Sequence, residues 1–323
     1  MEDPRSLTET TAAARRLIAA VEQVIAGNTA VVESAVVCLL AEGNLLLEGV
    51  PGVGKTMLAR AVARATGGTC RRVQGAPDLL PSDLTGVSIY DQERRQFIFV
   101  PGPVFANVVL VDEINRMSPR TQSALLEPME ERQVTVEGVA RTLPSPFFLV
   151  ATENPVEHHG TFPLPEGQLD RFTMAVSVGY PSPDEERGVV TRQLVRHPIE
   201  DLQPVLGSDE VVRHQHVVRR IHASPAVVDY AVAVASATRT HPATLIGASP
   251  RAAVALTRCA QARAAVRGRE YVLPDDVKVL APSVLAHRLL TGPDARSSPA
   301  AGRDIVLEVL ERLPVPLGEA RSA

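Results

Sequence analysis

Tryptophan is absent from this sequence, and aromatic residues make up only 3% of its 323 residues. Proteins that bind single-stranded nucleic acid stack bases on aromatic side chains, and the scarcity of such side chains argues against that class. The formal net charge of −4 also gives the whole chain no basic footprint. We therefore do not expect nucleic acid as a partner.

Long hydrophobic runs are also missing. The longest apolar stretch, Ala35–Ala41, is far shorter than the ~20 residues that cross a bilayer. The first ten residues include acidic residues and lack the apolar segment of a signal peptide. The three cysteines, Cys38, Cys70 and Cys259, are odd in number and form no C-x-x-C pair, which fits a reducing compartment. We expect a cytoplasmic protein without a transmembrane segment.

Lysine is almost absent. Only Lys55 and Lys278 of the 33 basic residues are lysines, and the others are arginines. A lysine in such a chain is a candidate for a role that needs a compact ammonium rather than a planar fork. Lys55 lies in the most specific motif of the sequence.

That motif is Gly49–Thr56, GVPGVGKT, which fits the phosphate-binding pattern G-x-x-x-x-G-K-[ST]. It follows an apolar run and opens a helical pattern, as a P-loop requires. Backbone N–H groups and the helix N-terminus would hold the phosphates, Lys55 would reach the β- and γ-phosphates, and Thr56 would bind Mg²⁺. The predicted nucleotide-binding residues are Gly49, Val50, Pro51, Gly52, Val53, Gly54, Lys55, Thr56 and Met57.

Two acids follow the buried run Val108–Val111. In open α/β sheets ligands bind at the carboxyl ends of the strands, so we expect Asp112 to hold Mg²⁺ together with Thr56. Glu113 would polarise the water that attacks ATP. Paired acids after a strand are also common on surfaces, but the P-loop upstream favours ATP hydrolysis.

Asn154 follows the apolar run Phe147–Ala151. Its amide is a candidate to orient the attacking water or to sense the γ-phosphate. The alternative is a simple turn made by Asn154 and Pro155.

Two arginines are further candidates. Arg171 precedes the last predicted strand and could stabilise a transferring phosphoryl group, or else form a salt bridge with Asp170 or Glu166. Arg251 begins a helix and could reach phosphate from above, or be an ordinary solvated arginine.

Short apolar runs and helical patterns alternate before residue 180, which predicts a parallel α/β sheet. The helical patterns are Thr56–Thr66 and Pro119–Glu131, and Val87–Val100 and Val134–Leu143 have the alternation of inserted hairpins. The expected strands are Asn44–Glu48, Cys70–Val73, Val108–Val111, Phe147–Ala151 and Met174–Val178.

A proline-rich break at Tyr180–Pro183 is the expected domain boundary. We predict an ATPase core over residues 1–180, with a helical extension at 1–23, and a small all-α domain with a tail over 181–323. Several of its helices begin at proline, which suits the first helical turn. The expected helices are Pro183–Val195, Pro225–Arg239, Pro250–Arg267, Pro274–His287 and Arg303–Leu313.

The order of these motifs resembles the MoxR family of AAA+ ATPases from about Val24 to about Leu290. The segments that carry the resemblance are GVPGVGKT, LLPSDLTG, PGPVFANVVLVDEINR, QSALLEPMEERQVTVEG, ATENP, LPEGQLDRF and GASPRA.

The resemblance implies a P-loop AAA+ core with a helical lid, assembled into a hexameric ring with ATP between subunits. Arg171 would then act in trans as the arginine finger, Asn154 as sensor 1, and Arg251 as sensor 2 in cis. The two hairpins would be the helix-2 insert and the pre-sensor-1 hairpin, which line or cap the pore.

The family's work is chaperone-like remodelling, often with a separate partner that carries a von Willebrand factor A domain. A chelatase-type motor for metal insertion and a nucleic-acid motor of the same superfamily are the alternatives. The chain departs from the family pattern at Asn28, Asn44 and Glu153, where Gln, His and Gln are common, and at Pro128, which we expect to kink a helix.

Overall fold

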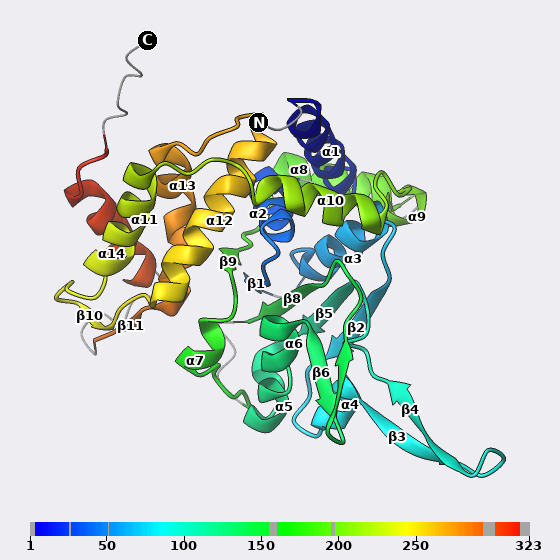
Figure 1. The fold of residues 1–323 in the computed structure, drawn as a ribbon. Helices are drawn as coiled ribbons and strands as arrows, with labels where there is room; N and C mark the ends of the chain where they lie inside the picture. The colour runs from blue at the N-terminus through cyan, green and yellow to red at the C-terminus, as the bar shows by residue number, and fades with distance from the viewer. Residues whose placement is uncertain are drawn as a thin grey trace.

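The computed structural model describes residues 4–25, 27–50, 52–154, 160–194, 198–292 and 301–316. Its centre is a five-stranded sheet in the order β2-β5-β8-β1-β9, and all neighbouring strands are parallel (Figure 1). The predicted parallel α/β core is therefore confirmed. The strands are Leu45–Glu48 (β1), Cys70–Gln74 (β2), Val108–Asp112 (β5), Phe148–Glu153 (β8) and Met174–Ser177 (β9).

Both faces of this sheet are covered. Side chains alternate between two hydrophobic cores along each strand, so that Leu45 and Leu47 enter one core and Leu46 the other. The first core also contains residues of α1, α2, α3 and the C-terminal helices, and the second contains residues of α4 and α6. Burial on both sides of the sheet explains why the sequences of the central strands are unbroken apolar runs.

Short helices connect the strands of the core. One expected helix, Pro119–Glu131, is two: α5 ends at Ser123 and α6 begins at Leu126. Pro128 stands in the first turn of α6, where its missing N–H removes no helical hydrogen bond, so it does not kink a helix interior. The helices are Pro4–Glu22 (α1), Thr29–Leu40 (α2), Lys55–Ala65 (α3), Pro81–Thr85 (α4), Pro119–Ser123 (α5), Leu126–Glu131 (α6) and Glu166–Leu169 (α7), with a 3₁₀ turn at Ile114–Arg116.

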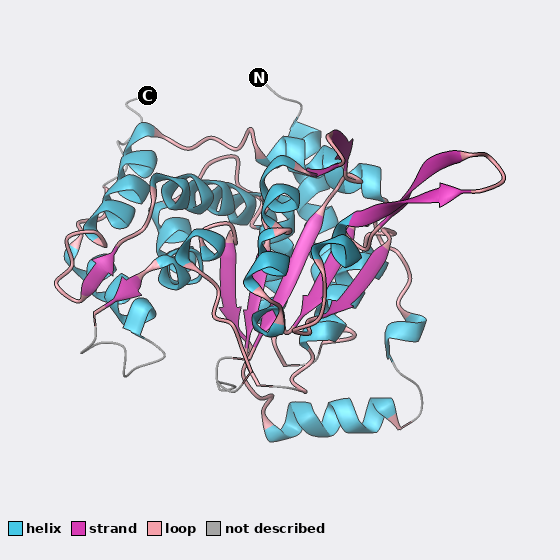
Figure 2. Cartoon of the chain, turned by 90° about the horizontal axis from the view of Figure 1, so that it is seen from below, coloured by secondary structure: helices cyan, strands magenta, loops and turns pink. Residues whose placement is uncertain are grey.

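Two antiparallel hairpins interrupt the α/β order, as predicted. Strands β3 (Gly86–Asp91) and β4 (Gln96–Pro101) form a long hairpin that projects away from the sheet (Figures 1 and 2). Strands β6 (Gln133–Val136) and β7 (Val139–Thr142) form a shorter one. Its turn residues are Glu137 and Gly138, both with positive φ (53° and 77°), as a tight two-residue hairpin turn requires.

The C-terminal part is a helical lid. The prediction that it holds no strand was wrong, because Thr244–Ile246 (β10) pairs antiparallel with Leu290–Thr291 (β11). Strands of three and two residues are too short for their alternation to show in sequence. The helices are Pro183–Gln193 (α8), Pro198–Asp201 (α9), Ser208–Val218 (α10), Pro225–Ala237 (α11), Pro250–Val266 (α12), Pro274–Leu285 (α13) and Ala301–Arg312 (α14), with a 3₁₀ turn at Ala286–Arg288.

Helix α1 joins the two regions. It contacts α2 and α3 of the core and also α10 and α12 of the lid (Figure 1). Residue 180, where we predict the boundary between the two domains, lies in the loop between β9 and α8. The boundary itself stays a prediction. No helix among the described residues has the length and hydropathy needed to cross a membrane.

Candidate ATP site

The P-loop follows β1 directly and ends in the first turn of α3. Gly52 and Gly54 have positive φ values of 87° and 89°, a conformation that favours glycine. A side chain at Gly49 would place its Cβ 2.5 Å from the carbonyl oxygen of Val178. The glycines of the motif are thus required by the turn itself. Pro51 lies outside the described residues.

Lys55 is buried at the start of α3 and points across the loop. Its Nζ donates hydrogen bonds to the carbonyl oxygens of Gly49 and Glu153, the latter at 3.1 Å. Burial lowers the pKa of the Lys55 ammonium, while the carboxylates of Asp112, Glu113 and Glu153 act in the opposite direction. A partly desolvated ammonium surrounded by acceptors is suited to a phosphate, which is a stronger acceptor than a carbonyl.

Asp112 ends β5 at the same edge of the sheet. Its Oδ2 accepts a hydrogen bond from the Thr56 hydroxyl at 3.0 Å, and its Oδ1 accepts one from the Thr152 hydroxyl at 2.6 Å. The Arg72 guanidinium also donates to Oδ2, at 2.7 and 3.1 Å. Burial of Asp112 works to raise its pKa, but the hydrogen bonds from Thr152, Arg72 and Thr56 outweigh it and lower the pKa. The carboxylate is therefore ionised at neutral pH.

Glu113 is held in an unusual backbone conformation, with φ 57° and ψ 54°. Such conformations cost energy in residues other than glycine and cluster at functional sites. The backbone N–H of Glu113 donates to the Thr152 hydroxyl at 2.9 Å. Gln74 Nε2 donates to its carboxylate at 2.8 Å, and Arg116 forms a salt bridge with it at 3.1 Å. The side chain is thus oriented by two neighbours.

Asn154 follows β8 and is buried. The side chain of Asn115 donates a hydrogen bond to its carbonyl oxygen at 3.4 Å, which ties the end of β8 to the turn after Glu113. The alternative of a turn with Pro155 falls on a residue outside the described ones.

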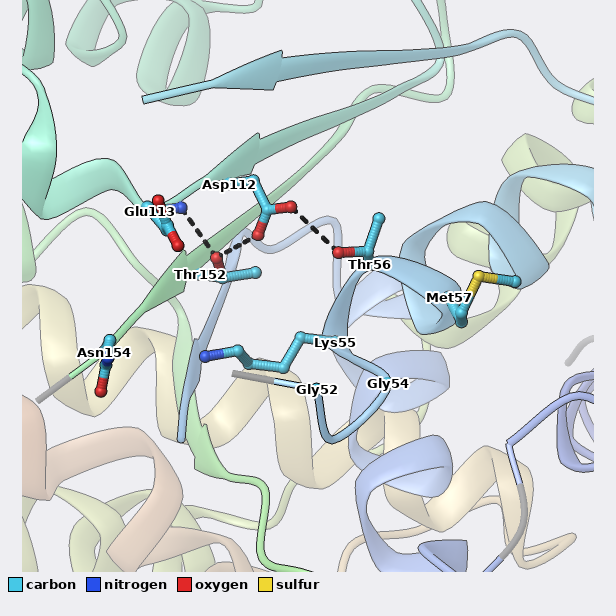
Figure 3. Close-up of a pocket in the computed structure, with 9 residues that line it drawn as sticks. All are labelled: Gly52, Gly54, Lys55, Thr56, Met57, Asp112, Glu113, Thr152 and Asn154. Carbon is cyan, nitrogen blue, oxygen red and sulfur yellow. Dashed lines mark hydrogen bonds between the residues drawn. The ribbon is translucent and has the colours of Figure 1, made fainter. Parts of the chain in front are cut away.

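These side chains share one pocket of about 270 Å³ (Figure 3). Lys55 and Asn154 reach it from one side, and Thr56, Asp112 and Glu113 from the other. The residues that line it are Gly52, Gly54, Lys55, Thr56, Met57, Asp112, Glu113, Thr152 and Asn154. The structure therefore brings together residues of the P-loop motif, the two acids and the polar amide that the sequence singled out.

The two candidate arginines do not line this pocket. Asn44, the residue before β1, donates a hydrogen bond to the carbonyl oxygen of Arg171 at 3.3 Å. Arg171 therefore lies at the amino edge of the sheet, whereas the P-loop lies at the carboxyl edge. Strand β1 spans four residues, so the two edges are separated by roughly 13 Å.

Arg251 lies beside Arg171. Both guanidinium groups form a salt bridge with Glu130, that of Arg171 at 3.4 Å. The alternative for Arg171 was a salt bridge with Asp170 or Glu166, but its salt bridge is with Glu130. Asp170 accepts hydrogen bonds from Ser249 and Arg288 instead. Arg251 does not line the pocket of its own chain that holds the P-loop, and its cis role stays a prediction.

A separate cleft of about 430 Å³ surrounds these arginines. Six arginines and three carboxylates line it, so the cleft is positively charged and suited to an anion. These residues are Arg132, Arg171, Arg219, Arg251, Arg258, Arg288, Glu42, Glu130 and Asp170.

Four residues that contact the candidate site residues were not predicted from the sequence. They are Arg72, Gln74, Glu130 and Thr152. Each acts through a neighbour on another strand or helix, which spacing alone does not reveal. For Gln74 one signal exists, because β2 is paired in register with β5 and Gln74 lies directly opposite Asp112. A polar residue at the end of the neighbouring strand is a candidate partner for the acids.

Comparison with known proteins agrees with this geometry. The family model AAA_3, described as "ATPase family associated with various cellular activities (AAA)", matches residues 44–174. A second model, the AAA lid domain, matches residues 236–309. The first covers strands β1 to β8 and the pocket, and the second runs from the end of α11 into α14.

Similar proteins match most of the chain. Chaperone MoxR1 of Mycobacterium tuberculosis is 43% identical over 93% of this chain and 82% of its own length. YeaC of Bacillus subtilis, itself described as uncharacterized, is 46% identical over 92% of this chain and 93% of its own length. A crystal structure from Cytophaga hutchinsonii, of a protein designated provisionally as an ATPase, is 34% identical with a TM-score of 0.90, covering 97% of this chain and 98% of that one.

Fold, pocket and relatives define an AAA+ ATPase with a nucleotide-binding core and a helical lid. The chain belongs to the MoxR family of these ATPases.

Proposed function

We propose that the protein hydrolyses ATP at sites shared between neighbouring subunits of a ring, and that this drives the remodelling of a protein partner. The observation that carries the shared site is the separation of Arg171 from the P-loop by the length of β1. One chain cannot bring both to the same phosphate, but a neighbour that docks its amino edge against this pocket can. Arg171 and Arg251 then both act in trans.

Within the pocket each residue has a distinct task. Lys55 binds the β- and γ-phosphates, Glu113 polarises the attacking water, and Asn154 orients that water. Thr56 and Asp112 fit Mg²⁺, because a hydroxyl and an ionised carboxylate 3.0 Å apart are oxygen ligands of the kind it prefers. No group of three His, Cys, Asp or Glu side chains among the described residues is arranged to hold a metal, which suits an ion completed by phosphate and water.

Mixing two inactive variants tests the shared site. Arg171→Ala retains Glu113, and Glu113→Gln retains Arg171, so each variant supplies what the other lacks. We expect each alone to bind ATP and to hydrolyse it poorly, and the mixture to recover activity. A mixture no more active than the mean of its parts would contradict the proposal.

The remodelling task is supported by two features. A similar protein is named a chaperone, and the β3–β4 hairpin exposes apolar side chains at its far end, with Phe97 71% and Tyr90 54% exposed. We propose that this hairpin grips a protein partner, and that a protein with a von Willebrand factor A domain is one such partner. Phe97→Ala should leave basal ATP hydrolysis unchanged and weaken stimulation by that partner.

The alternatives make different predictions. A nucleic-acid motor would show ATP hydrolysis stimulated by DNA or RNA, and we expect no stimulation. A chelatase-type motor would be stimulated by a metal-inserting partner rather than by a protein client. We place the protein in the cytoplasm, where its thiols, Cys38 and Cys259 both buried and free, would stay reduced.

A further inference from the structure

Glu130 connects the two arginines that the proposed shared site requires. Its Oε2 pairs with Arg171 of the core and its Oε1 with Arg251 of the lid. Its side chain is only 27% exposed, as is that of Arg171, so water screens this contact less than an ordinary surface pair. One carboxylate therefore joins two guanidinium groups that would otherwise repel each other.

The position of Glu130 in the chain adds a second connection. It lies at the end of α6, three residues before the β6–β7 hairpin begins. Glu127, one turn earlier in α6, accepts hydrogen bonds from the backbone N–H and the hydroxyl of Thr135 in that hairpin, at 2.9 and 2.6 Å. Helix α6 and the β6–β7 hairpin are thus fixed to each other.

The two hairpins are in turn joined. The Ser88 hydroxyl in β3 donates to the Glu137 carboxylate at the turn of the β6–β7 hairpin, at 2.6 Å. The guanidinium of Arg141 in β7 lies 3.9 Å from the centre of the Phe99 ring in β4, within the range of a cation–π contact. A continuous set of contacts therefore runs from the projecting hairpin to Glu130.

We propose that Glu130 is a positioning residue that holds Arg171 and Arg251 as one pair for the ATP of the neighbouring subunit, and that it links this pair to the two hairpins. The inference rests on the proposed shared site. Glu130 itself does not touch the nucleotide of its own chain, since it lies in the arginine cleft at the opposite edge of the sheet.

Glu130→Gln keeps the size of the side chain and removes its charge. Without the charge of Glu130 the two arginines lose their common partner and shift. We expect kcat to fall roughly 10- to 100-fold, because a displacement of about 1 Å in a catalytic group can lower the rate by up to about 100-fold. ATP binding to the variant should be unchanged within two-fold. Adding Glu130→Gln to Arg171→Ala should lower kcat further by a smaller factor than Glu130→Gln does alone, because only its effect through Arg251 remains. Glu131→Gln, an exposed neighbour, is the matched control and should behave as the wild type.

The decisive test mixes Glu130→Gln subunits with Glu113→Gln subunits, with the Arg171→Ala and Glu113→Gln mixture run alongside. Rescue in both mixtures supports the inference. Rescue of Arg171→Ala but not of Glu130→Gln overturns it and leaves the shared site intact. Rescue in neither overturns the shared site and the inference with it.

A second variant covers the case in which Glu130→Gln does not assemble. Glu130→Asp keeps the charge on a shorter stem, so it cannot pair with both arginines at once. We expect an intermediate kcat and the same rescue by Glu113→Gln subunits. A Glu130→Asp variant with normal kcat would contradict the positioning role.

Discussion

Glu48 and Glu153 are register partners on the adjacent parallel strands β1 and β8, at the edge of the sheet where the P-loop begins. Burial raises the pKa of both carboxyl groups, and the charge of Glu48 adds to the effect on Glu153, whose pKa rises to about 7 despite the nearby Lys55 ammonium. A protonatable group therefore lies beside Lys55, the lysine of the P-loop motif.

This pair predicts that stability falls as the pH rises. The ordinary pKa of a glutamate is 4.5, and that of Glu153 in the folded chain is about 7. At a pH between these two values Glu153 holds a proton in the folded chain but not in the unfolded chain. Unfolding then releases a proton, so the free energy of unfolding decreases across this window, by about 3 kcal/mol at most. Glu153→Gln removes the penalty and should raise the free energy of unfolding at pH 8 by roughly 2–3 kcal/mol, with little change near pH 4.5.

Urea unfolding at the two pH values measures this effect. Glu93→Gln, at the exposed tip of the β3–β4 hairpin, is the control and should change stability equally little at both. An equal effect of Glu153→Gln at pH 4.5 and pH 8 would show that the Glu153 carboxyl is not perturbed.

Lys55 should not be replaceable by arginine. Its ammonium fits between the carbonyl oxygens of Gly49 and Glu153, and a planar guanidinium is larger and has a fixed geometry. We expect Lys55→Arg to weaken nucleotide binding at least about 10-fold, nearly as much as Lys55→Ala. Titration with a fluorescent ATP analogue measures the affinity. The control is Lys278→Arg, which changes the only other lysine, outside the pocket, and should leave the affinity unchanged. Normal binding by Lys55→Arg would refute this use of lysine.

Arg72 should compete with Mg²⁺ for Asp112. It donates twice to Oδ2, the same oxygen that faces Thr56, and its side chain is 52% exposed, so the pair is worth up to about 1 kcal/mol. Arg72→Gln should therefore lower the Mg²⁺ concentration for half-maximal nucleotide binding by up to about 5-fold. The neighbouring exposed Arg71→Gln should not change it. A higher Mg²⁺ requirement in Arg72→Gln would mean that Arg72 supports the metal site instead.

Glu113 is expected to be the general base. Glu113→Gln keeps the hydrogen bond from Gln74 but cannot accept a proton, so hydrolysis should slow by ~10²–10⁴-fold while ATP binding is retained. Single-turnover hydrolysis separates these two quantities. Wild-type turnover in this variant would remove Glu113 from the mechanism.

Much of the core could be predicted from sequence because its signals are local. Buried strands such as Val108–Asp112 are unbroken apolar runs, and the P-loop pattern is contiguous. The hairpins were found from their alternation and from the Glu137–Gly138 turn. Helices α2, α4, α7, α9 and α10 were not predicted. Three of them, α4, α7 and α9, have only four or five residues. No proline or strong apolar pattern marks α10 as it marks α11 and α12.

The site partners were harder to predict because they depend on register and docking. Thr152 is bonded to Asp112 only because β8 lies beside β5. Glu130 is a charged residue near the end of a short helix, and nothing in the sequence says that a lid helix brings Arg251 to it. The position of Arg251 could not be predicted for the same reason, since the place where α12 meets the core is a tertiary feature.

The central claim is that ATP is bound between subunits, and native mass tests it most directly. Light scattering of Glu113→Gln, without nucleotide and with ATP, would show whether ATP assembles the protein. The account predicts a shift with ATP from smaller species to a mass near six subunits of 34.6 kDa. A chain that stays monomeric at every concentration, while its wild type hydrolyses ATP, would have a complete site in one subunit and would contradict the shared site.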